Sequence, residues 1–162
     1  MHEGLSPEDK TRLTRDPSQS AHEAVPVKDV VVLICGHGGR DARCGTMGPL
    51  LRDSFTSVFE REGTPVTDAP PSAEGGAARV GLISHIGGHK FAGNVIVYIP
   101  PGMTLPDGSA HKLAGCAVWY GRVEPRHAEG IVAATIRGGK VVGELFRGGI
   151  DAEGGILDIE SK

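Results

Sequence analysis

The sequence has few aromatic residues, few cysteines and no long apolar run. Phe, Trp and Tyr together make up only 4% of the 162 residues, so Val, Ile, Leu and Ala must fill most of any core. Three cysteines are an odd and low number, unlike the paired sets of a secreted disulfide scaffold. The longest apolar run, VVVLIC, is far too short to cross a bilayer. We therefore expect one compact domain with no membrane partner.

The chain also lacks an excess of positive charge. Its formal net charge is −3 and its pI is about 6.1. Without a broad basic field, nucleic acid is not an expected partner. The first ten residues contain three acidic side chains and no apolar stretch, a composition unlike that of a secretory signal or a mitochondrial presequence.

The distribution of proline and apolar residues predicts one domain with a polar segment at each end. Residues 1–27 are polar and contain three prolines, which is typical of a flexible arm or linker. Residues 28–150 are expected to fold as the domain, and residues 151–162 to form a tail.

Hydrophobic spacing predicts the strands and helices of this domain. Apolar and β-branched runs predict strands within residues 29–35, 79–86, 94–100 and 115–123, with a short edge strand near Val66. Apolar residues three and four positions apart predict a helix from Thr46 to Glu60, with Thr46 as its N-cap. A closing helix over 124–139 should end at its two final glycines, and no strand is expected after it.

This order of elements predicts an α/β (α+β) domain in which helices flank a small central sheet. A thioredoxin-like layout fits, because its first long strand ends in a cysteine-bearing loop that leads into a helix. A thiolate at that position would face unpaired backbone N–H groups and the positive end of the helix dipole.

Two pairs of metal-ligating residues follow two of the predicted strands. Cys35 and Cys44 have eight residues between them, and His85 and His89 have three, each pair lying in a glycine-rich loop. Two thiolates and two imidazoles make four ligands, the number usual for a structural zinc ion or a 2Fe-2S cluster. Zinc knuckles usually carry a closer cysteine pair, so the spacing favours a cluster, with zinc as the alternative. The loop glycines would let backbone N–H groups turn toward cluster sulfides.

Other polar residues near these pairs receive a structural interpretation. His37 resembles part of a Rieske box, but no second Cys/His box follows, so it is expected to be a loop residue or a supporting donor. The charges within residues 40–43 would form internal ion pairs or a solvated group. Lys90 is expected to be simply exposed, with steering of an acidic redox partner as the alternative. Asn94 is expected to cap its loop or bond the backbone.

The remaining chemically active side chains are expected to be structural. Cys116 has no partner motif and should be a small buried hydrophobe. The isolated histidines His111 and His127 are predicted to be exposed. Of the neighbours Trp119 and Tyr120, one should belong to the core, and the other would pack there too or near the cluster.

Three segments together resemble the fungal sucrase/ferredoxin-like family, whose members include the altered-inheritance-of-mitochondria and actin-patch-distribution types. They are CGHGGRDARCG, SHIGGHKFAGNVIVYIPP and VWYGRV, and the resemblance covers residues 29–139. It implies a thioredoxin-like ferredoxin domain with a bis-histidinyl, non-Rieske 2Fe-2S cluster. Carried over to this chain, the cofactor-binding and metal-ligating residues are Cys35, Cys44, His85 and His89, and all four motif positions match.

The function implied is that of an electron-transfer or redox protein whose reduction is coupled to protonation of a ligand histidine. Its potential should lie above the roughly −400 mV of an all-cysteine ferredoxin, because imidazoles replace two negative thiolates. No nucleotide or flavin motif is visible, which favours an electron carrier or redox sensor over an enzyme, and no catalytic residue is assigned. The alternatives are a thioredoxin-like thiol oxidoreductase and a zinc-stabilised interaction module.

The expected partner is a redox protein of unknown identity, and the oligomeric state stays open. The resemblance implies a mitochondrial location, and a cytoplasmic one is the alternative.

Overall fold

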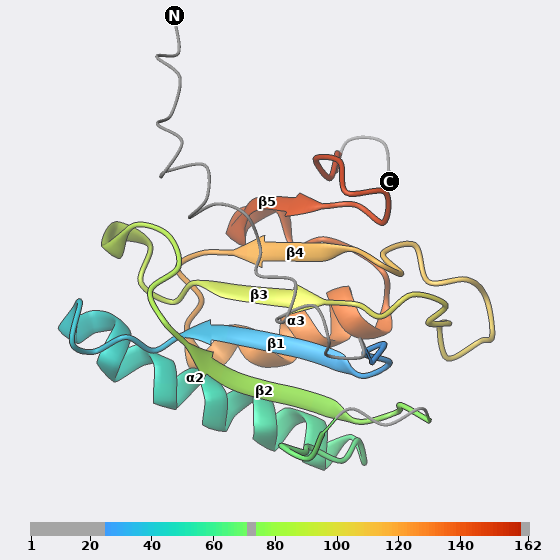
Figure 1. Cartoon of the computed structure of the whole chain (residues 1–162), viewed down its shortest axis with the longest axis horizontal. Coiled ribbons are helices and arrows are strands. Elements are labelled where there is room, and N and C mark those ends of the chain that lie inside the picture. Colours follow the sequence, from blue (N-terminus) through green and yellow to red (C-terminus); the bar gives the residue numbers. More distant parts are fainter. Residues whose placement is uncertain (1–24, 71–73, 160–162) are drawn as a thin grey trace, which may run out of the picture.

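The computed structural model describes residues 25–70 and 74–159, and its centre is one five-stranded sheet. Most of the predicted arm and the end of the predicted tail lie outside the described residues. The strands are β1 (Val30–Cys35), β2 (Ala78–Ile83), β3 (Val95–Tyr98), β4 (Ala117–Tyr120) and β5 (Phe146–Ile150). They lie side by side in the order β2-β1-β3-β4-β5 (Figure 1).

The strand directions define the topology. β1 and β2 are parallel, and helix α2 (Ala42–Arg61) connects them, whereas each further pair across the sheet is antiparallel. A short 3₁₀ turn η2 (His89–Phe91) is the only helical element that the structure describes between β2 and β3. A βαβ unit followed by two antiparallel strands and a closing helix is the thioredoxin-like order. The predicted fold class is therefore confirmed.

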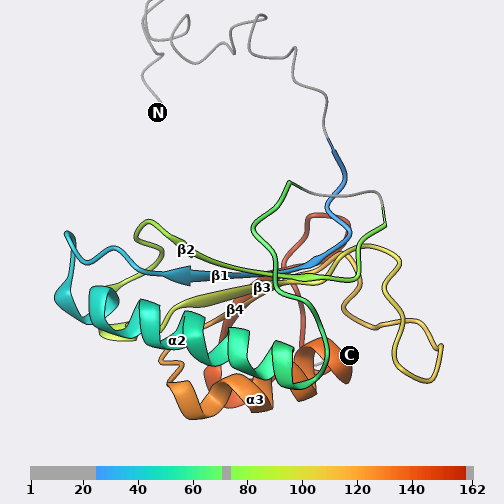
Figure 2. The ribbon, with the colours of Figure 1, turned by 90° about the horizontal axis from the view of Figure 1, so that it is seen from below.

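The closing helix is continuous but changes its winding. It passes from η3 (Pro125–His127) through α3 (Ala128–Ile131) into a π-helical stretch η4 (Val132–Arg137), and it ends at the predicted glycines. This helix and α2 lie on the same face of the sheet (Figure 2). Among the described elements, the helices thus flank one face only. No described helix is both long and apolar enough to cross a membrane.

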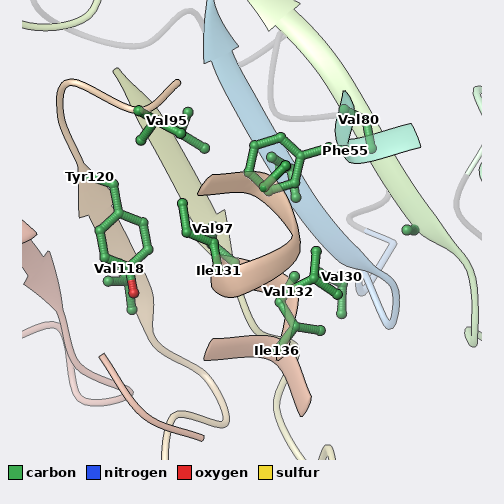
Figure 3. Packing of buried hydrophobic residues seen from close by; sticks show 14 of the residues in the cluster. Val30, Phe55, Val80, Val95, Val97, Val118, Tyr120, Ile131, Val132 and Ile136 are labelled. Carbon is green, nitrogen blue, oxygen red and sulfur yellow. The ribbon is translucent and has the colours of Figure 1, made fainter. Parts of the chain in front are cut away.

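The core lies between the sheet and these two helices. Alternate residues of the central strands point toward Phe55 of α2 and the closing helix (Figure 3). Three aromatic side chains are buried there, and the rest of the apolar core is mainly aliphatic, as the composition predicts. Each fully buried Val, Leu, Ile or Phe contributes about 1.5–3 kcal/mol. The participating residues that Figure 3 labels include Val30, Val80, Val95, Val97, Val118, Tyr120, Ile131, Val132 and Ile136.

Helix α2 begins four residues earlier than the sequence predicts. Its N-cap is Asp41, whose side chain accepts a hydrogen bond from the backbone N–H of Arg43 at 2.9 Å. Thr46 is therefore inside the helix and does not cap it. Pro49 is also inside the helix. The sequence pattern favours a start at Thr46 because proline, here Pro49, is usual in the first turn of a helix. That prediction was wrong, since the Asp41 cap sets the boundary.

Strand β5 is the element that the sequence analysis misses. Gly148 and Gly149 pair with Trp119 and Val118 of β4, although glycine has little intrinsic preference for strands. The chain still packs beyond this strand, since the backbone N–H of Leu157 donates to the oxygen of Gly149 at 3.0 Å. The edge strand expected near Val66 is an isolated bridge to Ala78.

The histidine prediction was wrong for His111, which is only 3% exposed. Its Nδ1 accepts a hydrogen bond from the backbone N–H of Leu113, so Nε2 carries the proton and donates to the oxygen of Ile136. His127 is half-buried, and its Nδ1 accepts from the backbone N–H of Glu124. Sequence spacing gives no sign of such backbone partners.

The predictions for the other structural side chains are confirmed. Cys116 is buried, and Tyr120 is the core member of the Trp119–Tyr120 pair. The hydroxyl of Tyr120 lies 2.6 Å from Oγ1 of Thr135 and accepts a hydrogen bond from the backbone N–H of Val142. Burial raises the pKa of Tyr120 above its usual value. Its polar end is thus satisfied inside the core.

Candidate metal centre

Three elements bring their ends together at one edge of the sheet. Cys35 is the last residue of β1, and His85 follows β2 by two positions. Because these neighbouring strands are parallel and Cys35 is in register with Ile83, both segments leave the sheet at the same edge. Helix α2 starts there too, and Cys44 is its third residue.

The soft side chains of these three residues form one group. The ligand atoms of Cys35, Cys44 and His85 all lie within 4.8 Å of one another. Sγ of Cys35 is 3.9 Å from Nδ1 of His85. Both cysteines are buried and His85 is half-buried. Thiolate and imidazole are the donors that suit zinc and iron–sulfur centres. Their role as ligands stays a prediction.

The two other histidines of the motif region are placed differently. His89 opens η2, four residues after His85, but its side chain lies outside the described part of the chain. His37 is exposed, and its ring lies close to Gly39 rather than to the cysteines. Among the described residues, His37 is not a member of the cysteine–histidine group.

The glycines of the cysteine loop allow it to lie directly against helix α2. A Cβ atom on Gly45 would lie 2.6 Å from Cα of Gly38, and one on Gly48 would lie 2.8 Å from Cα of Gly36. The N–H groups of Gly36 and Gly38 already donate to the oxygens of Ile83 and Gly36. These two N–H groups are thus already engaged within the protein, and the expectation that loop N–H groups turn toward a bound cluster stays a prediction for Gly39. Close approach of backbone to backbone is the reason that glycine is needed here.

The thiol of Cys44 does not have the low pKa expected at a helix N-terminus. Burial first, and then the hydrogen bond with Cys35, raise the pKa of Cys44 to about 11. The expectation fails because the side chain is fully buried, and desolvation is the largest cause of the shift. A reactive thiol needs the opposite shift, so this geometry disfavours thiol chemistry at Cys44.

The loop charges form an internal ion pair at the helix start. Both oxygens of Asp41 accept from the guanidinium of Arg43, at 3.0 and 2.9 Å. This hydrogen bond raises the pKa of Arg43 above its usual value. Arg40 is exposed. Of the two interpretations left open by the sequence, the internal pair is the one observed for Asp41 and Arg43.

Asn94 is a buried polar residue whose place sequence reasoning did not foresee. Its backbone oxygen accepts from the N–H of Cys35 at 3.0 Å, and its Oδ1 accepts from Nη1 of Arg147 at 2.6 Å. The expected loop cap is thus replaced by a distant arginine. The β1–β3 register ends at Ile34 and Val95, and the hydrogen bond from Cys35 to Asn94 continues it by one pair. In a continued antiparallel pair the two opposite side chains share a face of the sheet.

The amide of Asn94 also leaves an unused donor. Arginine only donates, so Oδ1 must face Arg147 and Nδ2 must point the other way. Nδ2 is buried and has no hydrogen-bond partner among the described residues. An unpaired buried donor costs about 1–3 kcal/mol. A bound acceptor on the Cys35 face of the sheet would remove that cost.

The fold and the grouped soft ligands together define a thioredoxin-like protein of ferredoxin-like character. The chain belongs to the sucrase/ferredoxin-like family, which it matches over residues 3–148.

Curated relatives from yeasts carry the name "Altered inheritance of mitochondria protein 32". The relative from Meyerozyma guilliermondii is 40% identical over 78% of this chain and 36% of its own length. The one from Clavispora lusitaniae is 41% identical over 78% of this chain and 37% of its own length. The chain thus spans little more than a third of these relatives.

Among solved structures, the wild-type thioredoxin-like 2Fe-2S ferredoxin from Aquifex aeolicus is similar. It is 20% identical, with a TM-score of 0.44, over 75% of this chain and 97% of that one.

Proposed function

We propose that this chain binds a 2Fe-2S cluster through Cys35, Cys44, His85 and His89 and acts as an electron-transfer or redox protein. The observation that carries the proposal is the meeting of three soft ligand atoms within 4.8 Å at the end of β1. Membership of a family described as sucrase/ferredoxin-like supports it. His89 enters through its spacing of four positions from His85.

The surroundings of this group fit such a cofactor. Both thiols are buried, as suits a cluster shielded from water, and a buried donor on Asn94 has no partner among the described residues. Cluster sulfides are anionic acceptors that take hydrogen bonds from such donors. When bound, the cluster supplies a one-electron redox centre.

The residues of the chain then set the potential and the proton coupling. Two imidazoles in place of two thiolates make the site less negative, which raises the potential above roughly −400 mV. An imidazole that binds through one ring nitrogen keeps a second nitrogen that can hold or lose a proton, so reduction would be coupled to protonation of His85 or His89. We expect a midpoint potential that falls as the pH rises from about 6 to about 9. A potential independent of pH would overturn the coupling.

Anaerobic purification followed by iron, acid-labile sulfide and visible absorption measurements tests the cluster itself. Electron paramagnetic resonance of the reduced protein, with nitrogen hyperfine analysis, tests histidine ligation. Cys44→Ser should lose iron, whereas Cys116→Ala, which alters a buried cysteine outside the metal group, should keep it. Absence of iron and acid-labile sulfide after anaerobic purification would refute the proposal.

Substitutions of the histidines test which of them bind the cluster. His85→Cys and His89→Cys should keep a cluster but lower its potential, because each adds a thiolate. His37→Ala should leave both iron content and potential unchanged, since His37 is exposed and outside the metal group. Loss of the cluster in His37→Ala would require a different ligand set.

A zinc-stabilised interaction module is the second candidate function. The compactness of the three ligand atoms also suits a single tetrahedral ion. A colourless protein with about one zinc per chain would favour it. The thiol oxidoreductase is disfavoured by the raised pKa of Cys44.

The biological setting follows from the same proposal. We expect an electron carrier or redox sensor, with a redox protein as partner, rather than an enzyme in its own right. A mitochondrial location is supported by the names of the relatives, with the cytoplasm as the alternative. Fractionation of cells that express the full-length protein at its native level tests the location.

A further inference from the structure

Three cations surround one aromatic ring beside the candidate metal centre. Nζ of Lys90 lies 5.0 Å from the centroid of the Phe91 ring, and the guanidinium carbons of Arg122 and Arg147 lie 5.1 and 3.9 Å from it. Below we call Lys90, Phe91, Arg122 and Arg147 the Phe91 cation group. Cations within about 6 Å of a ring centroid are attracted by its π-electrons, which offsets part of their mutual repulsion.

The three charges of this group are exposed and uncompensated. Lys90, Arg122 and Arg147 are all exposed. Within residues 25–70 and 74–159, no carboxylate lies at ion-pair distance from any of them, although six other arginines do form ion pairs. Since the whole chain has a formal charge of −3, this is a local reversal of sign.

The backbone holds Arg122 in an unusual conformation that brings it to the ring. Its φ of 59° makes it the one non-glycine residue of the described chain with a positive φ. Such a conformation costs about 1–3 kcal/mol for a residue with a side chain. Val123 supports it, because its N–H donates to the oxygen of Gly93 at 3.0 Å. The N–H of Arg122 also donates to the oxygen of Phe91 at 3.4 Å, so the fold fixes the backbone of Arg122 beside the ring.

Arg147 is held beside the ring by a hydrogen bond and by the space next to two glycines. Its guanidinium donates to the buried Oδ1 of Asn94 at 2.6 Å. A Cβ on Gly121 would lie 2.3 Å from Cδ of Arg147, and one on Gly87 would lie 2.7 Å from its Nη1. Two glycines thus leave the space that this arginine occupies.

The position of the group connects it with the metal centre. Lys90 and Phe91 directly follow His89, and Asn94, which holds Arg147, lies opposite Cys35 in the sheet. An electron-transfer partner must approach this edge of the domain. Arginines and aromatic rings are enriched in protein interfaces, and complementary charge accelerates the encounter of two proteins.

We propose that the Phe91 cation group is the docking surface for the acidic face of a redox partner protein. That the partner is a redox protein rests on the proposed function. That it presents an acidic surface rests on the arrangement of the three cations alone. Nucleic acid is not the partner, because the group is confined to one ring and forms no extended basic stripe.

The first experiment probes the surface without any cofactor. Iron-free, ¹⁵N-labelled protein is titrated with an octaglutamate peptide and, in parallel, with a 12-base-pair DNA duplex. The amide shifts should concentrate at residues 90–93, 121–123 and 147, and the peptide should bind at least as tightly as the duplex. Absence of peptide-induced shifts there, or a clear preference for the duplex, overturns the proposal.

Charge-reversal variants provide the matched control. The test variant is Lys90→Glu with Arg122→Glu. The control is Lys28→Glu with Lys140→Glu, which changes the total charge equally at two exposed lysines outside the Phe91 cation group. Lys28 lies at the start of β1, whereas Cys35 ends that strand. We expect the test variant to lose peptide binding at least about fivefold and the control to lose less than about twofold. Equal losses in the two variants overturn the proposal.

The second experiment uses the loaded protein. Its reduced form is oxidised by hexacyanoferrate(III), an anionic one-electron acceptor, as the Debye length is shortened with salt from about 30 to about 8 Å. A whole-chain charge of −3 predicts a rate that rises with salt, whereas the Phe91 cation group predicts one that falls. A rising rate in the wild type overturns the proposal. The charge-reversal test variant should reverse the salt dependence without changing iron content.

The two experiments separate the two claims. A protein that never binds iron but retains site-specific peptide binding leaves the acidic-partner surface standing and removes electron exchange. A protein with a normal cluster and no peptide binding supports electron exchange and overturns the acidic-partner surface.

Discussion

Alanine at Gly45 tests whether the cysteine loop really lies against helix α2. Gly45 is inside α2, where alanine should stabilise the helix by about 0.5–1 kcal/mol on conformational grounds alone. The matched control is Gly130→Ala in α3, where the added Cβ would meet nothing within 4 Å. The two substitutions share the same helix-propensity gain and differ in what the methyl group meets.

The opposing effect at Gly45 follows from one distance. The new Cβ would lie 2.6 Å from Cα of Gly38, whereas carbon atoms normally pack at about 3.5–4.0 Å. The obstacle is backbone, so the loop must move by about 1 Å or the helix must bend, and such overpacking costs about 1–3 kcal/mol. After the propensity gain is subtracted, Gly45→Ala should destabilise by about 1 kcal/mol, and Gly130→Ala should stabilise by about 0.5–1 kcal/mol.

Urea unfolding of the iron-free proteins, followed by circular dichroism, measures both changes. Iron content after anaerobic purification then reports on the site, because the loop that must move joins Cys35 to Cys44. We expect Gly45→Ala to bind less iron and Gly130→Ala to bind the wild-type amount. If Gly45→Ala stabilises the chain as much as Gly130→Ala does, the loop does not lie against the helix and the reasoning is refuted.

Three further predictions concern buried polar groups. Tyr120→Phe should lower the free energy of unfolding by about 1–3 kcal/mol, because Thr135 and the N–H of Val142 lose their partner; an unchanged urea midpoint would contradict this. The iron-free chain should lose stability as the pH rises from about 8.5 to 11, since the unfolded thiol of Cys44 ionises first; an equal loss in Cys44→Ser would contradict this. Asn94→Ala should lower the midpoint potential of the loaded protein, because a donor to sulfur favours the more negative reduced state; a redox titration with no change would assign Nδ2 another role.

Apolar periodicity predicts those parts of the fold whose residues meet the core. The buried run of β1 and the apolar stripe of α2 are both found where expected, because burial on a sheet face or helix stripe leaves a sequence period. Strand β5 has no such period, since Gly148 and Gly149 pair through their backbones alone. Its existence depends on β4 already being in place.

The candidate site likewise has parts that a local sequence pattern predicts and parts that only tertiary contacts create. The spacing of the cysteines and histidines is local, and it indicates the group that Cys35, Cys44 and His85 form. Asn94 and Arg147 meet only because β3 and β5 belong to one sheet, so no local pattern reports their hydrogen bond. The burial of His111 also has no local sequence signal, since both of its hydrogen-bond partners are backbone groups.

The eight-residue loop between Cys35 and Cys44 leaves both thiols buried. A Cys-x-x-Cys pair at a helix N-terminus keeps a thiol near the helix dipole and lowers its pKa. Here the longer loop leaves Cys35 on the strand and places Cys44 in the first turn of the helix, where both are at most 1% exposed. Burial then raises the pKa of Cys44 instead of lowering it, so a bound metal ion is what would make it a thiolate. The buried setting of Cys44 thus disfavours disulfide exchange at this thiol.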